Sequence, residues 1–153
     1  MPLEIKLAYH DIDDIRMLFQ EYTCMLGVDL EFQNYNTELL NLPGEYALPD
    51  GRLYMAVYDD QLAGCVALRP FDSSCCEMKR LFVRPEFRGK RIGRALVEQI
   101  ISDAKDMHYQ AVLLDTLTSL KDSIALYQKL GFQETSPYRY NPLSNALYLR
   151  LDL

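Results

Sequence analysis

Metal-binding and disulfide-forming residues are scarce in this sequence. It contains two histidines, His10 and His108, and four cysteines, none of which form a C-x-x-C pair. A structural zinc site needs paired ligands at short spacing, so we expect no bound metal. The cysteines are more typical of small buried apolar residues in a reducing cytosol than of a disulfide framework.

Long apolar segments and an excess of basic residues are also lacking. No apolar run approaches the roughly 20 residues that a membrane span requires. The N-terminus lacks the apolar core of a secretion signal, so the sequence predicts a cytoplasmic protein without a membrane partner. The formal net charge of −6 argues against a nucleic-acid partner, because such proteins need a basic surface to displace counterions from phosphates.

What is present is the composition of a globular protein. The chain has 153 residues, of which 49% are hydrophobic and 25% are charged. A chain of about this size can bury roughly 68–70% of its unfolded surface. We therefore expect a single domain, residues 1–153, whose core needs neither disulfides nor a metal.

Hydrophobic periodicity predicts a mixed α/β protein with one sheet. Strands are expected over residues 3–7, 53–58, 62–68, 75–83, 111–114, 132–135 and 146–151. Helices are expected over residues 12–26, 34–42, 92–107 and 119–130. Asp11 fits an N-cap, and Gly27 and Gly131 fit C-terminal caps.

Positive charge is concentrated in one stretch. Residues 79–94 hold seven basic residues and one acidic residue, a net charge of +6, and the rest of the chain carries −12. Within this stretch a strand gives way to a helix through a basic loop that contains Gly89 and Gly93. Unpaired N–H groups at a helix N-terminus, glycines and flanking basic side chains together suit phosphate oxygens. The alternative is a basic loop that only caps the helix.

Two segments resemble the GNAT superfamily of N-acetyltransferases. Arg88-Gly89-Lys90-Arg91-Ile92-Gly93 is similar to the R/Q-x-x-G-x-G/A motif with which that family binds the acetyl-CoA pyrophosphate. Ala125-Leu126-Tyr127-Gln128-Lys129-Leu130-Gly131-Phe132 is similar to the end of the family's fourth helix. The sequence departs from the pattern at Arg91, which replaces the first motif glycine, and at Leu120, where many members carry an asparagine that contacts the cofactor.

The resemblance implies a GNAT-type acyl-CoA N-acyltransferase fold, with a mixed central sheet of about seven strands and about four helices. It also implies an acetyl-CoA-dependent N-acetyltransferase. The implied cofactor-binding residues are Leu81, Phe82, Val83, Arg88, Gly89, Lys90, Arg91, Ile92, Gly93 and Arg94. Leu81 and Val83 would act through the main chain.

The implied reaction is direct attack of a primary amine on the thioester in a ternary complex. Tyr127 matches the family's acid, and a phenol with a pKa near ~10 is protonated at neutral pH and can serve the leaving thiolate. Glu77 lies eleven residues before Arg88, the spacing of the family's base glutamate, and is the candidate base through a water. The alternative for Glu77 is a solvent-facing residue paired with Lys79 or Arg80. His108, Asp115 and His10 are weaker base candidates.

The acceptor is expected to be a small-molecule amine or an amine of a protein or peptide. Aromatic and polar residues from two regions are candidates for lining its site, with core packing as the alternative: Tyr22, Phe32, Tyr35, Tyr46, Tyr138, Tyr140 and Asn141. The competing function is a non-catalytic acyl-CoA-binding sensor or regulatory partner on the same scaffold. A homodimer is compatible with the resemblance.

Overall fold

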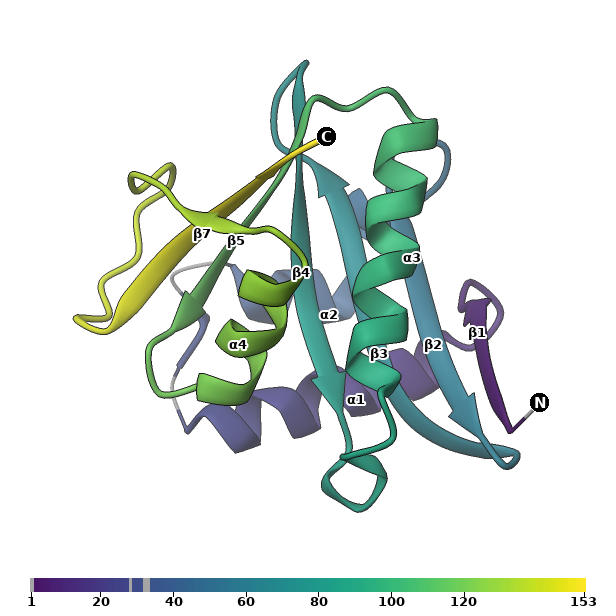
Figure 1. The fold of residues 1–153 in the computed structure, drawn as a ribbon. Coiled ribbons are helices and arrows are strands. Elements are labelled where there is room, and N and C mark those ends of the chain that lie inside the picture. The colour runs from purple at the N-terminus through teal and green to yellow at the C-terminus, as the bar shows by residue number, and fades with distance from the viewer. Residues whose placement is uncertain (1, 28, 32–33) are drawn as a thin grey trace.

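One sheet organises the molecule (Figure 1). The computed structural model describes residues 2–27, 29–31 and 34–153. In this part of the chain the sheet has seven strands in the order β1-β2-β3-β4-β5-β7-β6. The strands are β1 (Leu3–Leu7), β2 (Arg52–Tyr58), β3 (Gln61–Pro70), β4 (Cys75–Val83), β5 (Ala111–Leu117), β6 (Gln133–Glu134) and β7 (Ala146–Asp152). Every neighbouring pair is antiparallel except β4 and β5.

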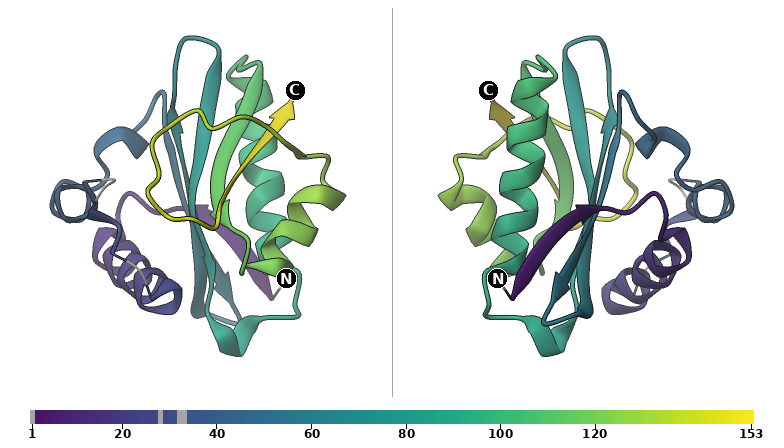
Figure 2. Two further views of the ribbon diagram at one scale, coloured as in Figure 1. Left: turned by 90° about the vertical axis from the view of Figure 1, so that its left-hand side faces the viewer. Right: turned by 90° about the vertical axis from the view of Figure 1, so that its right-hand side faces the viewer.

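Helices cover both faces of this sheet (Figure 2). On one face lie α1 (Ile12–Leu26) and α2 (Tyr35–Leu40), and on the other lie α3 (Ile92–Asp106) and α4 (Lys121–Lys129). Two 3-10 turns, η2 (Gly44–Tyr46) and η3 (Pro85–Phe87), follow α2 and β4. Seven strands and four helices in the described residues confirm the predicted fold class.

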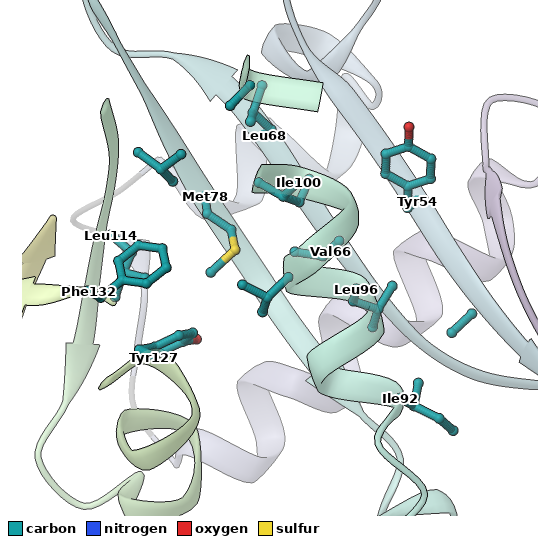
Figure 3. Close-up of a cluster of buried hydrophobic side chains, with 14 of the residues drawn as sticks. Tyr54, Val66, Leu68, Met78, Ile92, Leu96, Ile100, Leu114, Tyr127 and Phe132 are labelled. Atoms are coloured by element: carbon teal, nitrogen blue, oxygen red, sulfur yellow. The ribbon is translucent and has the colours of Figure 1, made fainter. Parts of the chain in front are cut away.

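The two faces of the sheet have separate apolar cores. On the α3 face, Ile92, Leu96 and Ile100 recur at helical spacing and are buried against the sheet with residues of α4 (Figure 3). On the α1 face, Ile15 and Phe19 are buried in the second core. Each helix therefore buries one stripe, and the sheet is apolar on both sides around its central strands.

The parallel pair in the middle of the sheet is short. β4 pairs with β5 only from Cys75 to Glu77, opposite residues 111–113. Beyond Glu77 the two strands diverge, as Figure 1 shows. The pairing of β4 with β3 is irregular opposite residues 65–67, and Arg80 there has a positive φ of 61°. This irregularity bends β4 away from β5 and opens the sheet along its middle.

Several element boundaries differ from the sequence prediction. β5 continues to Leu117, three residues further than predicted, and β6 is only two residues long. Asp11 occupies the N-cap position of α1 without a side-chain capping bond, whereas Gly27 caps the helix in the left-handed region as predicted. The four cysteines are unpaired. Among the described residues, no helix is long and apolar enough to cross a bilayer, and no cluster of three metal-ligating side chains is found.

Candidate active site

The divergence of β4 and β5 creates a pocket that we call the β4–β5 gap. It is lined by Met78–Leu81 of β4 and Leu114–Leu117 of β5. Tyr22 of α1 lines it from one face of the sheet and Tyr127 of α4 from the other. The gap therefore passes through the sheet and is accessible to groups from both helical layers.

The edge of β4 in this gap is suited to an extended ligand. Beyond Glu77, its backbone groups on the β5 side have no partner strand in the described part of the sheet. Leu81 lines the gap, and the Phe82 side chain is buried against Tyr22 with ring centroids 6.2 Å apart. Val83 pairs with Gly64 of β3. Main-chain N–H and C=O groups, rather than side chains, are what this strand offers to a ligand.

Tyr127, the candidate acid, reaches the gap from α4. It lies near Met78 and Leu114 in the core of the α3 face (Figure 3) and lines the gap. Its ring packs against Phe132 at a centroid distance of 5.6 Å, and only 5% of the residue is exposed. Burial raises the pKa of the Tyr127 phenol well above its ordinary value, so the hydroxyl stays protonated at neutral pH.

Glu77 lies in a different environment from the one predicted. The residue is fully buried, and its carboxylate accepts hydrogen bonds from Arg69 Nε at 2.9 Å, Tyr138 Oη at 2.7 Å and Arg139 Nη2 at 2.9 Å. Burial alone would raise the pKa of this carboxyl, but the cations Lys79, Arg69 and Arg139 and the Tyr138 hydroxyl lower it. The alternative that Glu77 faces solvent is wrong, because these partners enclose the carboxylate, and Glu77 is not among the residues that line the gap.

A second buried ion pair does face the gap. Lys79 Nζ lies 3.4 Å from Asp115 Oδ1, and Asn141 Nδ2 donates to Asp115 Oδ2 at 3.2 Å. Burial and the nearby Arg80 lower the pKa of Lys79. Burial would raise the pKa of Asp115, but Lys79 and Asn141 hold it below its usual range. Of the weaker base candidates, only Asp115 lines the gap, and both His10 and His108 are exposed elsewhere.

Three of the seven basic residues in the stretch 79–94 form ion pairs with acidic residues from other elements of the protein. Lys79 pairs with Asp115, Arg80 with Glu38 at 3.0 Å, and Arg84 with Glu21 at 2.8 Å. Lys79 and Arg80 therefore hold β4 to its neighbours, and Arg84 holds the residue after β4 to α1. The sequence prediction of one continuous cationic island was too broad, because the net charge of a segment does not show which charges have partners elsewhere.

The remaining basic residues surround the start of α3. Arg88, Lys90, Arg91 and Arg94 are exposed around the N-terminus of this 15-residue helix. Arg91 adopts a left-handed φ of 62° at the N-cap, the backbone region that favours glycine. The helix thus begins with the backbone shape that the glycine motif provides, and its N-terminal N–H groups and four cations suit a pyrophosphate.

The predicted acceptor residues are divided among several environments. Tyr22 and Asn141 line the gap. Tyr138 is bound to Glu77, Tyr140 is 76% exposed, and Tyr35 and Tyr46 are buried. Phe32 lies outside the described residues. Arg69 and Arg139 were not among the predicted site residues. A signal for Arg69 was present, because a charged residue directly after the apolar run 65–68 indicates a buried polar partner.

Comparisons with known proteins agree with this geometry. A model of the acetyltransferase (GNAT) family matches residues 13–132. An uncharacterized N-acetyltransferase of Schizosaccharomyces pombe is 45% identical over 145 residues, which cover 94% of this chain and 89% of that protein. The IAA acetyltransferase of Azospirillum brasilense is 34% identical over 143 residues, which cover 92% of each chain.

Solved structures share the fold over its whole length. An acetyltransferase from Streptococcus agalactiae has a TM-score of 0.82 at 21% identity and covers 100% of this chain and 99% of its own. An N-acetyltransferase of Thermoplasma acidophilum in complex with coenzyme A has a TM-score of 0.76 at 19% identity, with both chains fully covered. The chain therefore belongs to the GNAT family of acetyltransferases, enzymes that take their acetyl group from acetyl-CoA.

Proposed function

We propose that this enzyme transfers the acetyl group of acetyl-CoA to a small primary amine by direct attack within the β4–β5 gap. The observation that carries the proposal is the position of the buried Tyr127, which lines a gap between two diverging parallel strands. Holding thioester and amine on one surface supplies several kcal/mol of the barrier reduction without a covalent intermediate.

The donor would be held by main-chain groups and by the basic loop. Leu81, Phe82 and Val83 offer the free edge of β4 to the extended pantetheine arm, in the way that a strand binds a neighbour. The pyrophosphate would lie at the α3 N-terminus, among Gly89, Ile92 and Gly93 and the exposed cations Arg88, Lys90, Arg91 and Arg94. The same backbone edge would donate N–H groups to the oxyanion as the tetrahedral centre forms.

Proton transfer in this proposal involves Tyr127 and the solvent in the gap. As the C–S bond breaks, the phenol donates its proton to the leaving thiolate. The pKa values of the buried Glu77 and Asp115 carboxyls are lowered, which makes both poor acceptors of an ammonium proton. The amine would therefore lose its proton to water before attack, and Glu77 acts as a positioning residue that holds Tyr138 and Arg139 of the β6–β7 connection.

A thiol-release screen with acetyl-CoA tests the proposal. Polyamines, amino acids, aminoglycosides and peptides would be offered as acceptors, and both free CoA and the acetylated product would be measured. Acetyl-CoA-dependent product formation from at least one small amine is the expected result. Binding of acetyl-CoA without turnover of any of these amines would contradict the proposal and support a non-catalytic acyl-CoA sensor.

A further inference from the structure

A second pocket lies beside the β4–β5 gap, on the α2 side of the sheet. Its volume is about 360 Å³, and the side chains that define its chemistry are Glu38, Asn41, Glu45, Tyr46, Arg69 and Arg139. This volume falls within the range of small-molecule sites, roughly 300–1,000 Å³. We call it the arginine pocket, because Arg69 and Arg139 are the cations that line it.

The two arginines share one buried carboxylate. Glu77 accepts hydrogen bonds from both guanidinium groups, through Nε of Arg69 and through Nε and Nη2 of Arg139. Arg69 has a second acidic neighbour, Glu45, whose side chain is 69% exposed and lies 3.6 Å from Arg69 Nη1. The two guanidinium groups and the Glu77 carboxylate together carry one net positive charge, which the solvent-exposed Glu45 carboxylate offsets only in part.

Each guanidinium, both of which line the pocket, keeps one nitrogen that forms no hydrogen bond with the described residues. Among the described residues, no hydrogen bond is formed by Nη1 of Arg69 or by Nη1 of Arg139. Glu77 fixes both groups, and the rings of Phe71 and Tyr138 flank Arg139 at 5.5 and 5.9 Å. Arg69 is itself 92% buried, since its exposed fraction is 8%. Two preorganised guanidinium forks with one excess charge match a carboxylate, which they can bind in a bidentate manner.

The arginine pocket is linked to the β4–β5 gap by one ion pair and by one short segment of the β6–β7 connection. Glu38 of the pocket is paired with Arg80, which lines the gap, at 3.0 Å. Arg139 of the pocket is two residues from Asn141, which lines the gap and binds Asp115. A small molecule whose anionic end lay in the arginine pocket could therefore place its other end toward the thioester.

We propose that the arginine pocket binds a carboxylate of the acetyl acceptor, so that the acceptor is an amino acid or a related molecule with one amine and one carboxylate. This inference rests on the proposed acetyl transfer, because it names the acceptor of that reaction. A phosphate dianion fits less well, since Glu38 and Glu45 lie in the same pocket and only one positive charge is in excess.

Binding, measured without turnover, tests the inference independently of catalysis. The probes are ω-amino acids of three to six carbons, each compared by calorimetry with the alkylamine that lacks the carboxylate. O-phosphoethanolamine serves as the phosphate arm. The expected result is that at least one amino acid binds about tenfold or more tightly than its matched amine, as hydrogen bonds between charged groups imply.

Single substitutions test whether the preference for the carboxylate arises in the arginine pocket. Arg139→Gln should remove the preference for the carboxylate and leave binding of the matched amine within about twofold, and Arg139→Lys should restore part of the preference. Arg150→Gln is the control, because Arg150 is a half-exposed arginine paired with Asp152 on β7, outside the lining of the arginine pocket. It should retain the full preference.

Three results would overturn the inference: equal affinity with and without the carboxylate, a preference that survives in Arg139→Gln, or tighter binding of O-phosphoethanolamine. If Arg139→Gln folds poorly, the comparison of each amino acid with its matched amine on the wild-type protein still tests the inference. Failure of acetyl transfer is a separate outcome. A protein that shows the carboxylate preference but transfers no acetyl group would contradict the proposed function and leave the pocket assignment standing.

Discussion

Replacing Glu77 by glutamine is the most severe test of the ionic cluster that Glu77 forms with Arg69 and Arg139. The substitution keeps the shape of the side chain but removes the fully buried counter-charge that Arg69 and Arg139 share. Removing one partner of a buried ion pair costs about 3–5 kcal/mol, because the other charge stays buried without compensation. For a domain of this size each kcal/mol lowers Tm by about 2–4 °C, so we expect Tm to fall by about 6–20 °C.

The measurement is urea unfolding followed by circular dichroism, together with calorimetry for Tm. The matched control is Glu45→Gln, which removes the exposed acidic neighbour of the same Arg69 and should change the free energy of unfolding by less than about 1 kcal/mol. A loss below about 1 kcal/mol in Glu77→Gln would contradict the predicted cost of leaving the two arginines without this carboxylate. It would mean that water or another carboxylate compensates the two arginines.

Three further predictions follow from the same geometry. The pKa values of Glu77 and Asp115 are lowered in the folded state, so both carboxylates stabilise the fold fully above the ordinary carboxyl pKa of about 4. This stabilisation is lost as pH falls through the lowered pKa values. A free energy of unfolding that does not decline below about pH 4 would contradict this prediction. The double change Arg88→Gln and Lys90→Gln should weaken acetyl-CoA binding about tenfold or more by calorimetry with little effect on Tm, and an unchanged affinity would remove the assigned phosphate site. In Gly64→Ala the new Cβ would clash with the carbonyl oxygen of Phe82 in β4, so we expect a loss of about 1–3 kcal/mol in urea unfolding, and an unchanged midpoint would show that β3 and β4 can separate there.

Local patterns in the sequence predicted the elements well because they reflect local physics. Periodicity and the glycine at position 27 located α1 and its end, since a left-handed C-terminal cap favours glycine. The bounds of β4 were also predicted. β6 was predicted too long, because pairing with β7 and not its own sequence determines that only two of its residues join the sheet.

The chemistry of the site was harder to predict because it depends on contacts between distant segments. Tyr127 could be named as the candidate acid because a motif surrounds it. The environment of Glu77 could not, since Arg69, Tyr138 and Arg139 come from another strand and from the connection between β6 and β7. The positive φ of Arg80, at the irregularity that opens the β4–β5 gap, has no local signal, because arginine does not favour that conformation.

The central claim is that the Tyr127 phenol protonates the leaving thiolate in the β4–β5 gap. Tyr127→Phe removes one hydroxyl group from a buried ring that packs against Phe132, so the fold and the affinity for acetyl-CoA should be almost unchanged. The decisive measurement is the single-turnover rate of acetyl transfer to a good amine acceptor. The account predicts that this rate falls about 100-fold or more, as loss of a general acid implies. A rate equal to that of the wild-type enzyme, with acetyl-CoA bound and chemistry limiting, would contradict it.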